Sequence, residues 1–303
     1  MWNILKSDKK MQPDKTLYVS DLDGTLLDSS IRIPGEAADM INRAIDCGAL
    51  FTVATARTPG TLGSLLREIH LNLPAIVMTG ATMWHRDSGA YSNTQFFPES
   101  VISELREIYS SHGLSYFLYT LRDNKIYVYH HGPLSDMERE FIAARSHSPY
   151  KTFIIPPDGN SLFPEKIDNA MLLFAMQPAG MAHPAYRRLC EVEGVTPMCY
   201  NDANDPEIAM IEVFPEHASK AQAIRTLARD CGAGRIVVFG DNLNDLSMFA
   251  IADTAVAVSN AVPEVLEKAD VVIGHHDSSA VARYILSDYL DSADAAKSRI
   301  LEL

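Results

Sequence analysis

Two aspartates, Asp21 and Asp23, stand one residue apart where an apolar run ends and the chain turns at Gly24. A second acidic pair, Asp241 and Asp245, follows the apolar run RIVVF within the segment GDNLND. Carboxylates in such positions can attack as nucleophiles, transfer protons or bind a metal ion. Like charges at the mouth of a buried strand repel each other, so the arrangement indicates chemistry in which a cation or a proton balances them.

Other polar side chains fall at related positions in the chain. Thr55 ends the apolar run ALFTVAT, and Lys220 lies at the start of a helical stretch. In an open parallel sheet, ligands collect at the carboxyl ends of the strands. Taken singly, Thr55 reads as a hydroxyl bonded to backbone, Lys220 as a solvated lysine, and the later acidic pair as a helix cap. Their occurrence at equivalent places in the topology predicts a single site.

The elements that must position these residues alternate between short strands and helices. The first 80 residues predict strands at 17–20, 49–55 and 75–80, with helices from Pro34 to Gly48 and from Pro59 to Ile69. The same rhythm returns near the C-terminus, with strands expected at 235–240, 254–259 and 270–274 and helices at 218–231, 244–251 and 263–269. This order requires crossover connections and therefore predicts a mainly parallel, Rossmann-like doubly wound α/β sheet.

The segment between these two parts has a different character. It predicts an antiparallel aromatic hairpin, LSYFLYT and KIYVYH, together with helices at 98–111 and 134–146, strands at 170–177 and 208–215, and a helix after Pro184. We therefore expect a discontinuous core, residues 1–83 and 213–303, with an inserted α+β domain at 84–212. The charged residues of helix 134–146, Glu138 among them, are expected on a solvated face, and His130–His131 and His275–His276 on the surface.

Composition limits the possible partners. The 303 residues carry a net charge of −13, which argues against nucleic acid as a partner because binding a polyanion needs clustered Lys and Arg. The sequence contains no apolar run of about 18 residues and no recognisable secretory signal, so no membrane partner and a cytoplasmic location are expected. The 4 cysteines are far apart and predict neither a zinc site nor disulfides. Nothing in the sequence indicates an obligate protein partner.

The motifs together resemble a known family. DLDGT at 21–25, Thr55, Lys220 in HASKAQAI and GDNLND at 240–245 are similar, in this order, to the four motifs of the haloacid dehalogenase-like superfamily of hydrolases. The inserted domain resembles its type-2 cap, and the ending FGDNLNDLSMFAIAD is most similar to the Cof-type subfamily. The family commonly has Gly at the place of Ala56 and Asn at the place of Thr79, so this chain departs from the pattern at both positions.

The resemblance implies a role for each residue. Asp21 is expected to be the nucleophile that forms an aspartyl-phosphate, and Asp23 the general acid and base, beside Asp21 or in a partly desolvated position where it can hold a proton. A Mg²⁺ site is expected from the carboxylates of Asp21 and Asp241 and the backbone carbonyl of Asp23. Asp245 is expected to bind the ion directly or through the waters that the ion keeps. The expected phosphate and substrate contacts come from Thr55, Ala56, Arg57, Lys220 and Asn244.

The implied function is a Mg²⁺-dependent phosphatase that hydrolyses small phosphate monoesters such as sugar phosphates. Two alternatives stay open: a phosphomutase on the same scaffold, and a non-catalytic sensor of phosphorylated metabolites. Arg57 either reaches the substrate or pairs with an acid. The residues that choose the substrate are expected in cap loops such as 85–97 and 156–168, and the sequence fixes neither the substrate nor the oligomeric state.

Overall fold

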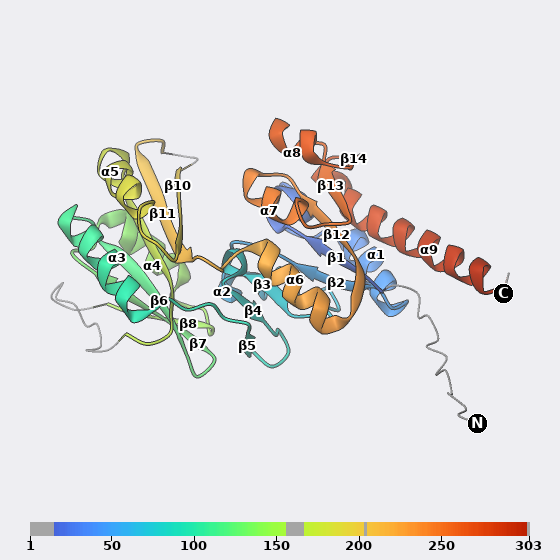
Figure 1. Cartoon of the computed structure of the whole chain (residues 1–303), viewed down its shortest axis with the longest axis horizontal. Helices are drawn as coiled ribbons and strands as arrows, with labels where there is room; N and C mark the ends of the chain where they lie inside the picture. The colour runs from blue at the N-terminus through green and yellow to red at the C-terminus, as the bar shows by residue number, and fades with distance from the viewer. Residues whose placement is uncertain (1–14, 156–166, 203–204, 302–303) are drawn as a thin grey trace, which may run out of the picture. The chain divides into compact units, whose positions relative to one another are not determined.

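The computed structural model describes residues 15–155, 167–202 and 205–301, with the backbone alone described for 292–301 (Figure 1). The expected specificity loop 156–168 therefore lies outside the described residues except for its last two. The chain forms two compact units. Within the described residues, the first unit holds 15–53, 67–73 and 224–301, and the second unit holds 54–66 and 74–223.

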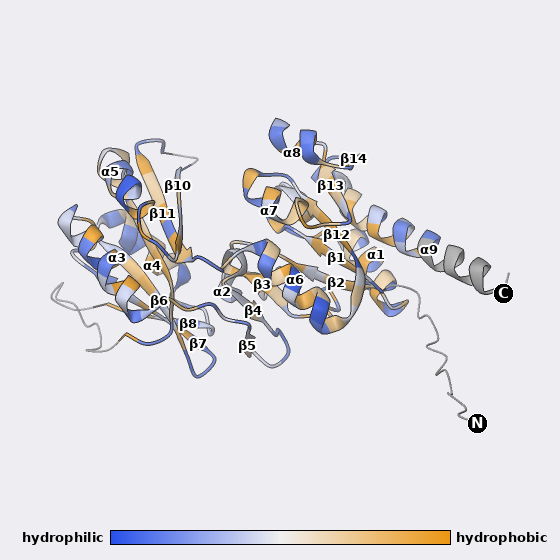
Figure 2. Cartoon of the chain, in the orientation of Figure 1, coloured by the Kyte–Doolittle hydropathy of each residue, from blue (hydrophilic) through white to orange (hydrophobic). Residues whose placement is uncertain are grey.

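The first unit is built on a parallel sheet with the strand order β14-β13-β12-β1-β2. Its strands are β1 (Lys15–Ser20), β2 (Leu50–Val53), β12 (Ala233–Gly240), β13 (Thr254–Val258) and β14 (Val271–Ile273). Its helices are α1 (Gly35–Asp46), α7 (Leu246–Phe249), α8 (Pro263–Lys268) and α9 (Ala280–Leu301), and α6 (Lys220–Cys231) begins in the second unit and ends in the first. Figure 2 shows hydrophobic residues concentrated on the strands, as expected where helices cover a parallel sheet.

The register of this sheet brings two loops to one edge. Ser20, the last residue of β1, pairs with Phe239 of β12, and the backbone N–H of Asp21 donates to the Phe239 carbonyl over 2.9 Å. The loops that begin at Asp21 and at Asp241 therefore leave neighbouring strands at the same end. This is the arrangement that the parallel-sheet prediction requires.

The second unit contains a six-stranded sheet with the order β10-β11-β9-β6-β7-β8, antiparallel except for the pair β7 and β8. Its strands are β6 (Tyr116–Arg122), β7 (Lys125–His131), β8 (Lys151–Ile154), β9 (Ala170–Pro178), β10 (Val195–Asn201) and β11 (Ile208–Pro215). The expected aromatic hairpin is β6 and β7, joined by Asp123 and Asn124, which both have positive φ.

Helices cover the two faces of this sheet unequally. Helices α3 (Glu99–Ser111) and α5 (Ala179–Leu189) pack on one face, where they bury side chains such as Leu118, Leu173 and Ile211. The shorter α4 (Asp136–Arg145) lies on the other face and places Phe141 against Phe117. Alternate residues of each strand therefore meet different helices.

The observed division of the chain differs in its bounds from the expected core and cap. Strand β3 (Ala75–Val77) pairs with β4 (Thr82–Trp84) and β4 with β5 (Tyr91–Ser92) in a three-stranded sheet, and Ala54 bridges to Ile76. These contacts attach 54–66 and 74–83 to the second unit, whereas the sequence predicted them in the core. The division into a catalytic core and a specificity cap stays a prediction.

Several elements also differ from the prediction. Helix α2 (Pro59–Leu62) is much shorter than expected, because Gly60 and Gly63 both disfavour a helix. Helix α5 begins at Ala179, so Pro184 lies inside it. Strands β4, β5, β8 and β10 were not predicted. In β10, Pro197 lowers the strand signal, and the strand lies at the edge of its sheet, where proline is tolerated.

Two polar side chains that were expected on the surface are buried. The Nε2 atom of His130 lies 3.3 Å from Oε1 of Glu138, and both side chains are inaccessible. Ser115 donates to the same carboxylate over 2.6 Å, and the Ser135 backbone N–H donates to it over 2.8 Å. Although burial opposes it, these hydrogen bonds hold the pKa of Glu138 below its ordinary value. The sequence pattern missed this pair because the two residues come from different elements.

All 4 cysteines are free thiols. In the described part of the chain, no helix combines the length and the apolar character needed to span a bilayer.

Candidate active site

The first loop of the candidate site is the tight turn that follows β1. The strand is buried and delivers Asp21 to the sheet edge with only 7% of its surface exposed. Gly24 takes φ +79°, which favours glycine, and the turn closes with a backbone hydrogen bond of 2.8 Å from Leu27 to Leu22. Asp23, in this same turn, is exposed, so of the two settings expected for it the partly desolvated position is not observed.

The second loop runs from Gly240 to Asp245. The Asp245 carboxylate is fully buried, and its Oδ2 accepts hydrogen bonds from the backbone N–H groups of Asp241 (3.0 Å) and Asn242 (3.2 Å). Asp245 therefore fixes the backbone that carries Asp241. Asn244 is exposed on the same loop.

The two loops bring three carboxylates together. Asp21, Asp241 and Asp245 each place one carboxylate oxygen within 4.8 Å of the others. The loops are also in direct contact, because Thr25 donates a 2.6 Å hydrogen bond to Oδ1 of Asp241. A Cβ added at Gly24 would lie 2.5 Å from Oδ2 of Asp241, so only glycine allows this approach. Clustered hard oxygen donors with converging negative charge fit a divalent cation.

The second unit holds another group of predicted site residues, arranged around a turn after β3. Thr55 is buried, its backbone N–H donates to the carbonyl of Ile76 and its carbonyl accepts from the N–H of Thr79, both over 3.0 Å. The Thr55 hydroxyl accepts a 3.1 Å hydrogen bond from the Arg57 backbone N–H. These bonds join the predicted Thr55 motif to the turn at 78–80.

That turn also contacts the start of α6. Met78, Thr79 and Gly80 all have positive φ, and a Cβ added at Gly80 would lie 2.3 Å from the Ser219 carbonyl. The next residue is Lys220, whose side chain is fully buried at the first position of α6. The structure thus links Thr55 and Lys220 through the turn at 78–80. Ala56 is exposed and Arg57 half-buried.

The comparison with family models is decisive. Residues 18–285 match the model of the haloacid dehalogenase-like hydrolases. The chain belongs to this family. The resemblance inferred from the motifs, including the Cof-type subfamily, is therefore confirmed, as is the α/β fold class.

Curated relatives of this hydrolase cover nearly its whole length. It is 25% identical over 289 residues to the 5-amino-6-(5-phospho-D-ribitylamino)uracil phosphatase YwtE of Bacillus subtilis, covering 88% of this chain and 95% of the relative. It is 24% identical over 289 residues to the pyridoxal phosphate phosphatase YbhA of Escherichia coli, covering 88% and 96%.

Solved structures of similar proteins support the fold. A haloacid dehalogenase-like hydrolase from Bacteroides thetaiotaomicron superposes with a TM-score of 0.70 at 23% identity, covering 90% of this chain and 98% of that one. A haloacid dehalogenase-like hydrolase from B. subtilis gives a TM-score of 0.68 at 21% identity, covering 89% and 98%.

Asn260, which no sequence motif of this hydrolase indicated, contacts the first loop. Its side-chain amide donates to the Gly24 carbonyl over 2.8 Å, and its carbonyl oxygen accepts from the His276 backbone N–H over 3.0 Å. Asn260 follows the end of β13, so the same strand-end rule that selected Asp21 and Asp241 would have found it.

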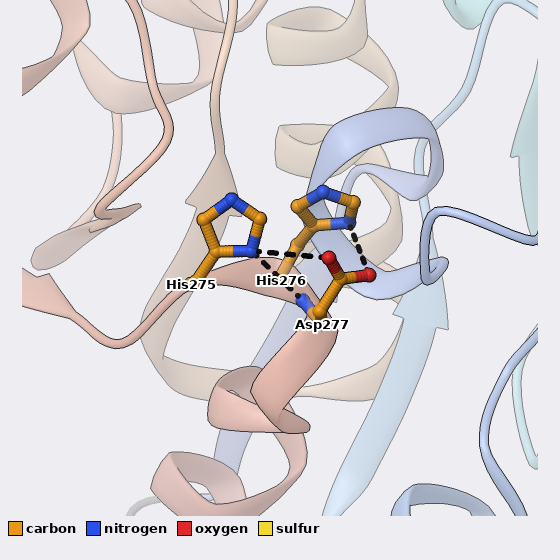
Figure 3. A group of neighbouring side chains, drawn as sticks. All are labelled: His275, His276 and Asp277. Atoms are coloured by element: carbon orange, nitrogen blue, oxygen red, sulfur yellow. Dashed lines mark hydrogen bonds and ion pairs between the residues drawn. The ribbon is translucent and has the colours of Figure 1, made fainter.

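His275, His276 and Asp277 form a second group with closely spaced potential ligands (Figure 3). Nδ1 of His276 donates to the Leu27 carbonyl over 2.7 Å, and the Asp277 carboxylate accepts from both the backbone N–H (2.7 Å) and the hydroxyl (2.8 Å) of Ser29. Because Nδ1 of His276 carries the donated proton, that nitrogen is not available to a metal ion. The group instead anchors the chain that follows the Asp21 turn.

Proposed function

We propose that this hydrolase is a Mg²⁺-dependent phosphatase of small phosphate monoesters that works through an aspartyl-phosphate on Asp21. The observation that carries the proposal is the convergence of Asp21, Asp241 and Asp245 within 4.8 Å at the end of a parallel sheet. The relatives YwtE and YbhA are both named as phosphatases of small phosphorylated metabolites, which supports the same reaction class here.

In the proposed reaction, a carboxylate oxygen of Asp21 forms a bond to phosphorus as the ester P–O bond breaks. The departing alkoxide takes a proton from Asp23. Asp23 then accepts a proton from the water that attacks the aspartyl-phosphate, which releases inorganic phosphate and restores Asp21.

The acidic residues are proposed to hold the ion. Mg²⁺, when bound, screens the repulsion between an incoming phosphoryl group and Asp21. Asp21 and Asp241 would bind it with their carboxylates and Asp23 with its backbone carbonyl. Asp245 uses one oxygen to fix the loop backbone, so it would contribute through its other oxygen or through a metal-bound water.

The phosphoryl oxygens are proposed to be bound by Thr55 and Lys220, with Asn244, Ala56 and Arg57 as further contacts. Lys220 begins a helix of 12 residues, where the positive end of the helix dipole adds to its charge. The Thr79 hydroxyl is buried and finds no hydrogen-bond partner among the described residues. A buried polar atom without a partner is costly, so we add Thr79 as a phosphoryl-oxygen donor.

The test is a panel of phosphate esters incubated with Mg²⁺ while inorganic phosphate is measured. The proposal expects phosphate release that EDTA abolishes and that Asp21→Asn lowers by at least about 1000-fold, while the surface variant Asp39→Asn keeps it. Isomerised ester without free phosphate would favour a mutase and overturn the proposal. Thermal stabilisation by the esters without any turnover would favour a sensor and also overturn it.

A further inference from the structure

One face of the six-stranded sheet carries two cationic side chains that the proposed chemistry does not use. Lys151, the first residue of β8, pairs in register with Ile126 of β7. Arg145 ends α4, the helix on this same face. Both side chains lie against the ring of Phe141, with the Arg145 guanidinium carbon 4.1 Å and the Lys151 Nζ 6.0 Å from its centre.

Lys151 is buried without a counterion. Its side chain is 4% exposed, and its Nζ lies 5.2 Å from the centre of the Phe153 ring. It makes no hydrogen bond or ion pair with any residue that the structure describes. Burial and the neighbouring Arg145 lower the pKa of Lys151 to about 8, so the side chain is still largely charged at neutral pH. A ring face offsets only part of the cost of removing an ammonium group from water.

Arg145 also lacks an acidic partner in the described part of the chain. Among the described residues, its only hydrogen bond goes to the Phe141 carbonyl over 3.4 Å, as expected for an arginine in the last turn of a helix. Burial, and the positive charge of Arg57, lower its pKa from the ordinary value. Arg57 lies two residues after Thr55, so Arg145 interacts electrostatically with a residue next to the motif proposed to bind phosphate.

Glu212, an acidic residue on the same face of the sheet, does not neutralise these two cations. Glu212 projects from β11 onto the same face, as its pairing with Phe174 requires, but it forms no ion pair with Lys151 or Arg145 among the described residues. Burial raises the pKa of Glu212 to about 7 even though Tyr200 donates a hydrogen bond to it, so its negative charge is weakened. Two adjacent cations, one of them buried, therefore face no full negative charge from the described chain.

We propose that Lys151 and Arg145 form a subsite for a second anionic group of the substrate. Preferred substrates are then phosphate monoesters that also carry a carboxylate or a second phosphate. An ammonium and a guanidinium side by side match such a group, which would relieve both their mutual repulsion and the cost of burying Lys151. The inference rests on the proposed function, because it names the substrate class of that activity.

The experiment compares pairs of esters that differ in one anionic group: phosphoglycolate with ethyl phosphate, and 3-phosphoglycerate with glycerol 3-phosphate. Binding is measured by calorimetry with the Asp21→Asn protein and Mg²⁺, and turnover with the wild-type protein. We expect the member that carries a carboxylate to bind at least about 10-fold more tightly than the member that lacks it. Lys151→Met and Arg145→Met should each bring the ratio close to one, whereas Lys151→Arg should retain most of it.

The matched control is Arg122→Met. The guanidinium carbon of Arg122 also lies over an aromatic ring of this sheet, 4.6 Å from the centre of the Tyr127 ring, but the residue is exposed at the hairpin. It should leave the ratio unchanged. Equal affinities for the two members of each pair, or a preference that survives both methionine variants, would overturn the subsite. Absence of turnover with every ester would overturn the proposed function alone, since the binding ratios decide the subsite independently.

Discussion

The hydroxyl of Thr25 donates a 2.6 Å hydrogen bond to Oδ1 of Asp241, across a separation of 216 residues in the chain. This bond joins the loop that carries the proposed nucleophile to the loop that carries a proposed metal ligand. Because it occupies one oxygen of Asp241, it fixes the orientation in which the other oxygen is presented.

Replacing Thr25 with Val should therefore weaken metal binding. The variant keeps the shape of the side chain but loses the donor, so we expect a roughly 10- to 100-fold rise in the Mg²⁺ concentration needed for half-maximal turnover. Thr25→Ser restores the hydroxyl and should behave like the wild type. An unchanged Mg²⁺ dependence in Thr25→Val would show that the bond does not position Asp241.

Replacing Gly24 with Ala should abolish the site by displacing Asp241. The added Cβ would lie 2.5 Å from Oδ2 of Asp241, in addition to the strain at φ +79°. Gly89→Ala is a matched control, because Gly89 has φ +69° but nothing within 4 Å of an added Cβ. Both variants should lose about 1 kcal/mol of stability from the strained φ, but only Gly24→Ala should lose activity. Similar activity losses in both would mean that strain, not the displaced carboxylate, is responsible.

The sequence predicted the parts of this fold that depend on local patterns. The apolar strands and strand-end polar residues indicated the parallel sheet and the meeting of Asp21 with Asp241, since the carboxyl ends of parallel strands lie at the same edge of the sheet. It could not predict that β3 would pair with β4 and β4 with β5, because such short strands carry little periodic signal. Nor could it predict the buried His130 and Glu138 pair, which depends on how α4 packs on the sheet.

The residues of the site also divide into features that local patterns predict and features that depend on how the chain packs. Gly24 and Asp245 stood out from their motif positions, but their structural tasks became clear only from their contacts with Asp241. Thr79 was noted only as a departure from the family pattern. In the structure Thr79 has a positive φ and a buried hydroxyl, and neither property can be read from the spacing of the motifs.

Replacing Thr79 with Val should separate stability from phosphate binding. Removing a buried hydroxyl without a partner should leave the free energy of unfolding unchanged or raise it by about 1 kcal/mol. If this hydroxyl binds a phosphoryl oxygen, the KM for phosphate esters and the inhibition constant for inorganic phosphate should both rise. A lower stability with unchanged KM would assign Thr79 a purely structural role. Urea denaturation and steady-state kinetics measure the two effects.

Glu212 predicts a pH dependence of stability. Burial raises its pKa from the ordinary 4.5 to about 7. As pH rises between these values, the unfolded chain releases the proton while the folded chain retains it, so the contribution of Glu212 to the free energy of unfolding falls across this window. Glu212→Gln, which carries no charge at any pH, should flatten the decline and be more stable than the wild type at about pH 8.

Urea denaturation at about pH 5 and at about pH 8 measures this effect. The exposed Glu207→Gln serves as the control and should follow the wild type at both values. If the free energy of unfolding falls between these pH values as steeply in Glu212→Gln as in the wild type, Glu212 is not the buried group that retains its proton.

The central claim is that Asp21 takes up the phosphoryl group. Turnover of a phosphate ester with Mg²⁺ should be stopped with acid and the protein digested and examined by mass spectrometry. The account predicts a phosphoryl group on the peptide that contains Asp21, absent from Asp21→Asn and absent when EDTA is present. Full turnover by Asp21→Asn, or a phosphorylated peptide from elsewhere in the chain with Asp21 unmodified, would contradict it.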